Sequence, residues 1–171
     1  MYRGMNMAEF KYSVPLFIYQ MWGYDCYSDE VLASIADAGY DGVEVPGATL
    51  QIRNPEALRK RIESHGLKVV AVTGLWGWAG GELGAVAEKD IMSSNPLWRS
   101  NAVRYIRDCV DLMVALGCRR INVSPGPLGK GDTSLAGIAA ARENLLQTMR
   151  EVLPYAEKND VLLPLEQNNR Y

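Results

Sequence analysis

The sequence contains one histidine and three cysteines among 171 residues, and it carries no marked excess of charge of either sign. The cysteines are odd in number and far apart, so they form no CxxC pair and no zinc-ligand pattern. We interpret Cys26, Cys109 and Cys118 as reduced, partly buried thiols. The net charge is −2, whereas a general nucleic-acid-binding protein usually carries a basic stripe. The composition therefore argues against a nucleic-acid partner.

Long apolar runs are also missing. The mean hydropathy is −0.12, and no run is long enough for a transmembrane helix. Near the N-terminus, Glu9 and Lys11 interrupt the sequence too early for a signal peptide, and the apolar stretch 14–19 is too short for one. We therefore expect a cytoplasmic protein without membrane contact. Because 48% of the residues are hydrophobic, we also expect one globular domain at 12–171, preceded by an extension at 1–11.

Short apolar runs alternate with helical periodicity along the chain. Three helices are expected to start at good N-cap residues, namely Ser28, Asn54 and Asn95. A fourth helix is expected at 135–159, because apolar residues recur there at helical spacing. Strands buried on both faces favour a parallel sheet covered by helices. Five apolar runs predict such strands, at 12–19, 42–45, 67–73, 120–124 and 161–166.

Two architectures contain this alternation. A flavodoxin-like, doubly wound domain has five parallel strands, whereas a (β/α)8 barrel begins in the same way but needs about 250 residues. A doubly wound domain normally closes with a helix after its fifth strand, but only residues 167–171 follow Glu166. We therefore expect a curved sheet with the strands in sequential order, as in a barrel. A complete flavodoxin-like binding domain remains the alternative.

Candidate site residues stand at the strand ends. Ligands bind at the carboxyl ends of the strands in both architectures, and Glu44, Asn122 and Glu166 lie at or near such ends. A carboxylate on an apolar strand is costly unless it is paired, hydrated or bound to a metal. Trp76 follows the third strand, where an aromatic ring can form one wall of a sugar pocket or simply pack on the rim. Glu44 can equally anchor a neighbouring loop. His65 lies at a helix end on the opposite side, and we interpret it as structural.

Four segments, in this order and spacing, resemble the xylose-isomerase-like TIM barrels of sugar phosphate isomerases and epimerases. The resemblance implies an α/β fold, a (β/α)8 TIM barrel of which this chain contains about five βα units. It extends from about residue 12 to residue 171. The segments are AGYDGVE at 38–44, SHGLKV at 64–69, LGCRRINV at 116–123 and AEKNDVLLPLE at 156–166.

The resemblance also implies a site. Members of this superfamily typically hold a divalent metal with Glu, Asp, His and Glu at the ends of the later strands. Glu166 stands where the first of these ligands stands, and the other three would lie beyond residue 171. Glu166 is therefore implied as both metal ligand and catalytic residue. From their positions at or after the strand ends, we expect Glu44, Trp76 and Asn122 to be substrate-binding residues. The implied cofactor is Mn²⁺ or Mg²⁺, bound weakly or not at all by this chain alone.

The function implied is an isomerase or epimerase of carbohydrate metabolism, which moves a proton next to the carbonyl of a sugar or sugar phosphate. One alternative is a non-catalytic half-barrel that binds or regulates. An endonuclease of the abasic-site type would need further histidines and a basic DNA-binding face, and this sequence offers neither. An open barrel leaves edge strands unpaired and inner apolar surface exposed, so we expect self-association.

Overall fold

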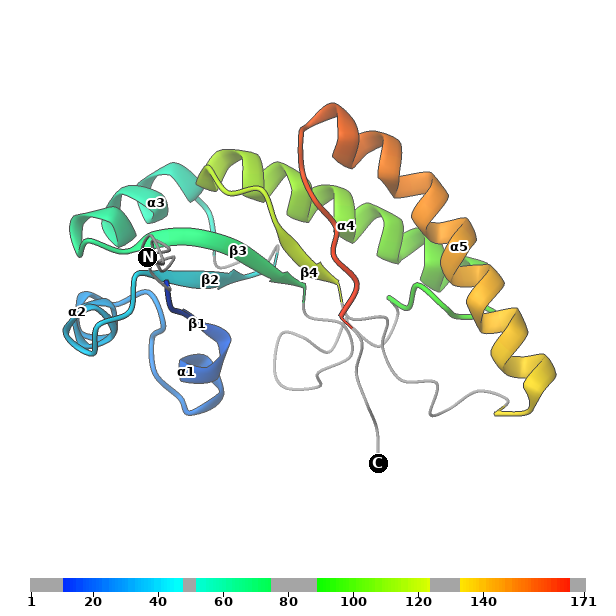
Figure 1. Ribbon diagram of the computed structural model, residues 1–171, viewed down its shortest axis with the longest axis horizontal. Coiled ribbons are helices and arrows are strands. Elements are labelled where there is room, and N and C mark those ends of the chain that lie inside the picture. Colours follow the sequence, from blue (N-terminus) through cyan, green and yellow to red (C-terminus); the bar gives the residue numbers. More distant parts are fainter. Residues whose placement is uncertain (1–10, 48–51, 75–88, 124–132, 167–171) are drawn as a thin grey trace, which may run out of the picture.

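The computed structural model describes residues 11–47, 52–74, 89–123 and 133–166 (Figure 1). Trp76 and nearly all of the expected extension 1–11 lie outside these ranges. Strands and helices alternate along the described chain. In order, they are β1 (Ser13–Pro15), α1 (Phe17–Met21), α2 (Asp29–Asp37), β2 (Gly42–Pro46), α3 (Pro55–Ser64), β3 (Lys68–Gly74), α4 (Pro96–Leu116), β4 (Ile121–Val123) and α5 (Leu135–Lys158).

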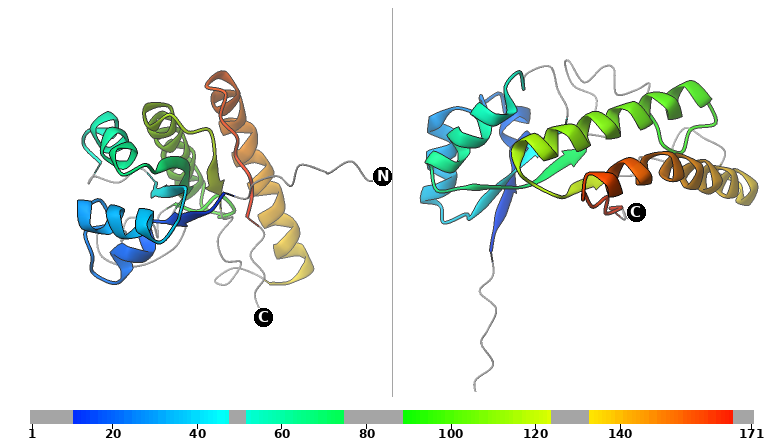
Figure 2. Two further views of the ribbon diagram at one scale, coloured as in Figure 1. Left: turned by 60° about the vertical axis from the view of Figure 1, so that its left-hand side comes forward. Right: turned by 90° about the horizontal axis from the view of Figure 1, so that it is seen from above.

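The strands form one parallel sheet in the order β1-β2-β3-β4. Figure 2 shows helices α2, α3, α4 and α5 arranged as an arc along one side of this sheet. Sequential strand order with helices on one side is the arrangement of a barrel, whereas a flavodoxin-like sheet reverses its order after the first strands. The expected barrel-like order is confirmed for these four strands, and the flavodoxin-like alternative is wrong.

The expected fifth strand lies beside β4 but is interrupted by a proline. Segment 162–166 joins β4 through two isolated parallel bridges, Arg120 to Leu162 and Val123 to Leu165. The backbone bonds run from Leu162 N to Arg119 O, from Ile121 N to Leu162 O, from Val123 N to Pro164 O and from Glu166 N to Val123 O. These bonds follow the alternation of a parallel ladder except at Pro164, which has no N–H to donate. The segment therefore continues the sheet in register.

The expected first strand at 12–19 is too long and has to be corrected. Strand β1 ends at Pro15, and the rest of the apolar run forms the short helix α1. Leu16 has helical backbone angles, and its carbonyl accepts hydrogen bonds from Tyr19 N at 3.1 Å and Gln20 N at 3.4 Å. A short apolar run has the same composition in a buried strand and in a buried helical turn, so periodicity does not separate them.

The helix starts follow the capping residues of the sequence. The side chains of Ser28, Asn54 and Asn95 accept hydrogen bonds from Val31 N, Ala57 N and Leu97 N, at 3.3, 3.0 and 3.0 Å. Each bond satisfies one of the free N–H groups of a first helical turn. Helices α2, α3 and α4 therefore start as expected, directly after the connections that leave the sheet.

The core lies between the helices and the face of the sheet that they cover. Val43, Val45, Val72, Ile121 and Val123 are fully buried on this face of the sheet. The three cysteines are free and buried as expected, and burial raises the pKa of Cys118 to about 11. No helix within the described ranges combines the length and hydrophobicity needed to cross a membrane. The helices contribute Leu32, Ile35, Ile62, Ile106, Met113 and Leu116 to the same core.

The only histidine has a structural position, as expected. His65 is the C-cap residue of α3, and its Nε2 atom lies 3.1 Å from Asp29 Oδ1 at the start of α2. Arg61 Nε lies 3.4 Å from the same carboxylate oxygen. The hydrogen bond with His65 and the charge of Arg61 lower the pKa of Asp29 below its ordinary value of 3.8. This cluster ties the start of α2 to the last turn of α3.

Acid should remove the contribution of this cluster. Because the folded-state pKa of Asp29 is lowered, its stabilisation is complete above pH 3.8 and is lost as the pH falls through the folded-state pKa. We expect Asp29→Asn to lower the urea midpoint of unfolding at neutral pH, and to lower it less at about pH 3. Glu30→Gln, in the same helical turn, is the control. An equal effect of Asp29→Asn at both pH values would contradict this account.

A glycine at the end of β2 is required by close packing. Gly47 N donates to Thr73 O at 2.8 Å. A Cβ atom on Gly47 would overlap the Tyr105 hydroxyl and approach Thr73 O to 3.1 Å. We expect Gly47→Ala to lower the free energy of unfolding by about 1–3 kcal/mol, measured by chemical denaturation, because overpacking forces neighbours to shift. Tyr105→Phe in the same chain should recover part of the loss, and full stability of Gly47→Ala alone would disprove the clash.

Candidate active site

Polar side chains follow the sheet across its strands, on the face turned away from the helices. Neighbouring residues such as Val43, Val72 and Ile121 are fully buried under the helices. Successive side chains of a strand point to opposite faces of the sheet. The residue next to each of these buried residues on its strand therefore points to the open face. We call this set the polar row. It consists of Ser13 on β1, Glu44 on β2, Thr73 on β3, Asn122 on β4 and Glu166 in the fifth strand segment.

Glu44 is held by hydroxyl groups from both neighbouring strands. Ser13 Oγ donates to Glu44 Oε1 at 3.3 Å, and Thr73 Oγ1 donates to Glu44 Oε2 at 3.2 Å. The carboxylate is half-buried, so these bonds offset part of the cost of burying its charge. Glu44 therefore has a fixed orientation at the rim of the sheet.

A register shift explains how Thr73 reaches Glu44. Val43 pairs with Val69, but Glu44 pairs with Ala71, so Val70 is an extra residue in β3. A one-residue shift moves every following side chain to the other face of the sheet. Without the shift, Thr73 would lie on the helix-covered face. The bulge therefore completes the polar row.

Asn122 and Glu166 form the second contact of the row. Asn122 Nδ2 donates to Glu166 Oε2 at 3.1 Å, and Glu166 N donates to Val123 O at 2.8 Å. Asn122 is also the register partner of Thr73, so the two side chains share a face. Glu166 is exposed, which leaves its carboxylate accessible to a ligand. The pair combines an oriented carboxylate with an amide at the carboxyl ends of neighbouring strands.

The sequence located three of these residues and missed two contacts. The structure brings Asn122 and Glu166 together and places Glu44 on the same face, while Trp76 lies outside the described residues. The hydrogen bonds from Ser13 and Thr73 to Glu44 were not expected. Ser13 could have been predicted as a polar contact, because it is a hydroxyl residue at the start of the first apolar run. The bulge that orients Thr73 contains no glycine, the residue that most clearly marks a bulge in a sequence.

A metal centre is not completed by the described residues. In the part of the chain that the structure describes, no three His, Cys, Asp or Glu side chains converge to hold a metal ion. Mg²⁺ and Mn²⁺ prefer about six oxygen ligands. Glu166 supplies one carboxylate and Asn122 one amide, so this donor set does not fit a divalent cation without further ligands.

Parallel strands in sequential order, helices on the covered face and a polar row at the carboxyl ends define part of a (β/α)8 barrel with its ligand-binding edge. The sequence of residues 32–171 matches the family model described as xylose isomerase-like TIM barrel. The chain belongs to this family. The expected fold, an incomplete barrel of this type, is thereby confirmed. None of the curated protein sequences gives a significant match.

Solved structures with the same fold include several sugar epimerases. The 3-keto-D-glucoside 4-epimerase YcjR from E. coli matches with a TM-score of 0.65 and 22% identity, over 83% of this chain and 51% of its own. A D-tagatose 3-epimerase-like protein matches with a TM-score of 0.71 and 16% identity, over 95% and 54%. An L-ribulose 3-epimerase matches with a TM-score of 0.70 and 24% identity, over 93% and 50%. At these identities the likeness establishes the fold, and the chain spans about half the length of these structures.

Proposed function

We propose that this chain forms part of the active site of a sugar isomerase or epimerase, with Glu166 as the residue that moves a proton next to the sugar carbonyl. The observation that carries the proposal is the contact between Asn122 Nδ2 and Glu166 Oε2 on the open face of the sheet. It lies where (β/α)8 barrels bind their substrates. The fold shared with sugar epimerases supports this choice of reaction.

The chemistry needs a positioned base and a group that stabilises the enolate oxygen. Glu166 is exposed enough to meet a substrate, and the hydrogen bond from Asn122 holds one of its oxygens in place. The second oxygen of Glu166 is the atom that we propose accepts the proton from a C–H group of the bound sugar. Glu44 and Trp76 are proposed to contact the hydroxyl groups and the apolar face of the sugar, which is either free or phosphorylated.

Metal dependence is a further part of the proposal. The family resemblance implies a Mn²⁺ or Mg²⁺ ion, to which Glu166 contributes one carboxylate. Since hard cations require about six oxygens, this chain alone should bind Mn²⁺ only weakly, in the millimolar range. Residues outside the described ranges or a complementing polypeptide must supply the remaining ligands.

The test is conversion of a ketose to its epimer. The purified chain is incubated with Mn²⁺ and a panel of ketoses and ketose phosphates. It is used alone and together with a polypeptide that supplies the remaining βα units, a combination that we call the closed barrel. The products are separated by chromatography. Epimer or aldose formation would support the proposal. Sugar binding without conversion by the closed barrel would instead favour the non-catalytic half-barrel.

We further propose that the open edges of the sheet pair with a second copy of this chain. Val70 is 38% exposed and Leu162 is 57% exposed on the open face, and Leu165 is 48% exposed in the edge segment. In the described part of the chain, β1 pairs only with β2 and segment 162–166 pairs only with β4. Unpaired strand edges beside exposed apolar side chains favour pairing with another chain.

A further inference from the structure

Helix α5 exposes an apolar flank on the side turned away from α4. The side that faces α4 is marked by Tyr155, whose Oη atom donates to Asp111 Oδ1 at 2.6 Å. Leu146 and Leu153 lie about half a turn around the helix from Tyr155, and they are 38% and 40% exposed. Figure 2 shows α5 at the end of the arc of helices, so no other helix of the described ranges lies beside this flank.

The edge segment beside α5 has backbone groups that are open to pairing. Its bonds toward β4 use the backbone groups of Leu162, Pro164 and Glu166. Successive residues of a strand direct these groups to opposite sides, so the N–H and C=O groups of Leu163 and Leu165 point away from β4. They bond to no residue that the structure describes. Because Pro164 faces β4, its missing N–H does not interrupt the open side of the segment.

Two opposite charges border the apolar flank of α5. Arg150 Nη1 lies 3.4 Å from Glu143 Oε1, and both side chains are exposed. They stand three residues before and four residues after Leu146, so both are its neighbours on the helix surface. When two α5 helices lie antiparallel about a two-fold axis between residues 146 and 147, Glu143 of each copy lies opposite Arg150 of the other. The charge pattern of this flank is therefore complementary to itself, which favours a second copy of this chain as the occupant.

The same two-fold axis places a large side chain opposite small ones. Leu153 of one copy lies opposite Ala140 and its neighbour Ala139 of the other, and both alanines are exposed. Small residues at a contact allow two helices to approach closely, so Leu153 becomes buried there. Leu135 lies one turn before Ala139 and opposite only the last turn of the second α5. It is therefore outside this contact.

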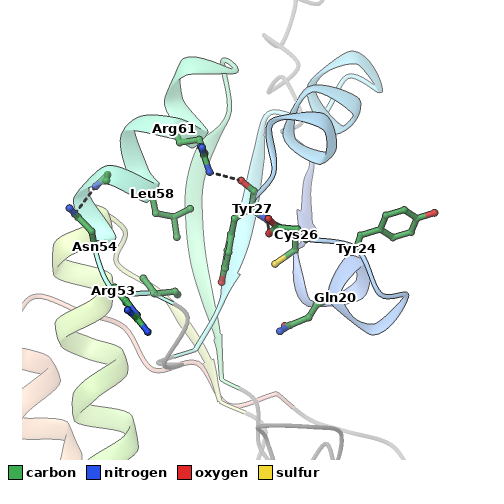
Figure 3. A pocket seen from close by; sticks show the side chains of 11 residues that line it. Gln20, Tyr24, Cys26, Tyr27, Arg53, Asn54, Leu58 and Arg61 are labelled. Atoms are coloured by element: carbon green, nitrogen blue, oxygen red, sulfur yellow. Dashed lines mark hydrogen bonds between the residues drawn. The ribbon is translucent and has the colours of Figure 1, made fainter.

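The chain covers part of its own apolar surface near the other end of the sheet. Leu58 on α3 and the Tyr27 ring line one cavity of about 930 Å³, and both are partly buried against the core (Figure 3). Arg61 Nη1 donates to Tyr27 O at 3.3 Å, which ties these two parts of the chain together. The flank of α5 has no such cover from the described residues. This difference favours the α5 end of the sheet for a contact between copies.

We propose that two copies of this chain associate through α5 and the edge segment about a two-fold axis, with the two α5 helices side by side and antiparallel. The proposal rests on the self-association proposed above and narrows it to one edge of the sheet. A two-fold axis perpendicular to the sheets keeps the helices of both copies on the same side, so helix contact and strand pairing form together. Leu165 alternates with Glu166 of the open face, so its side chain lies under the paired helices and loses its exposure.

The test exchanges charges between copies. Glu143→Arg places arginines opposite each other across the contact, and Arg150→Glu places glutamates opposite each other. Each variant alone should associate about tenfold more weakly than the wild type, because two attractive ion pairs become repulsive. An equal mixture of the two variants should recover wild-type association, since every arginine then faces a glutamate of the other copy. Sedimentation velocity over a range of concentrations measures each association constant.

The recovery on mixing reports only contacts between copies, because the charges within each chain are the same before and after mixing. The matched control is the exposed ion pair of Glu56 and Lys60 on α3. Glu56→Arg and Lys60→Glu should each associate like the wild type. No loss in the single α5 variants, no recovery on mixing, or a wild-type chain that stays monomeric would each overturn the proposal. None of these results depends on sugar conversion by the closed barrel, so this proposal and the proton transfer by Glu166 fail separately.

Discussion

Glu166→Gln should lower turnover of a closed barrel that contains these residues by about 10²–10⁴-fold, the usual contribution of a positioned acid–base group. The amide keeps the shape of the side chain and can still contact Asn122, which lies 3.1 Å away. The amide group of glutamine is not basic, so it does not remove the proton, although the fold is kept. Steady-state kinetics with a converted ketose would measure the loss, and circular dichroism would verify the fold.

A matched control separates chemistry from general charge effects. Glu157→Gln removes an exposed carboxylate from the outer helix α5, away from the polar row. We expect this variant to keep wild-type turnover. Weak Mn²⁺ binding should become weaker still in Glu166→Gln. Equal turnover of Glu166→Gln and the wild type would show that another residue is the base.

Replacing two leucines should abolish most self-association of the chain. Leu162 and Leu165 are 57% and 48% exposed in the edge segment beside β4. Burying apolar side chains of this size stabilises a contact by about 1.5–3 kcal/mol each, so Leu162→Ser with Leu165→Ser should weaken association by about tenfold or more. Sedimentation velocity over a range of protein concentrations would measure the change in association constant.

The matched control for association is Leu135→Ser. Leu135 is 88% exposed, but it lies at the start of α5 rather than at the sheet edge. We expect this variant to associate like the wild type. A wild-type chain that stays monomeric at all concentrations, with cooperative unfolding, would contradict the proposed pairing of open edges.

The sequence predicts most of the fold because local signals agree with the tertiary arrangement. Ser28, Asn54 and Asn95 cap helices in the structure, and each bonds a nearby backbone N–H as its side chain suggests. The first strand was too long in the prediction, since apolar residues fill both β1 and the helical turn at Phe17–Met21. Only the backbone angles of Leu16 distinguish the two.

The candidate site was predictable in position but not in its contacts. Glu166 and Asn122 stand at the ends of apolar runs, and the parallel order of the sheet makes them neighbours. The bonds to Glu44 depend on the extra residue Val70 in β3, which changes the face that Thr73 occupies. Such a register shift arises from the pairing of two strands. The residues of one strand alone do not specify it.

The most direct test of the central claim is the transfer of solvent deuterium into a sugar by the polar row. A closed barrel containing these residues is incubated in D₂O with Mn²⁺ and a ketose that it binds, and the sugar is examined by NMR. We predict deuterium at a carbon next to the carbonyl with the wild type, and none above background with Glu166→Gln. Exchange at the wild-type rate in Glu166→Gln, or none with the wild type, would contradict the claim that Glu166 moves a proton at this site.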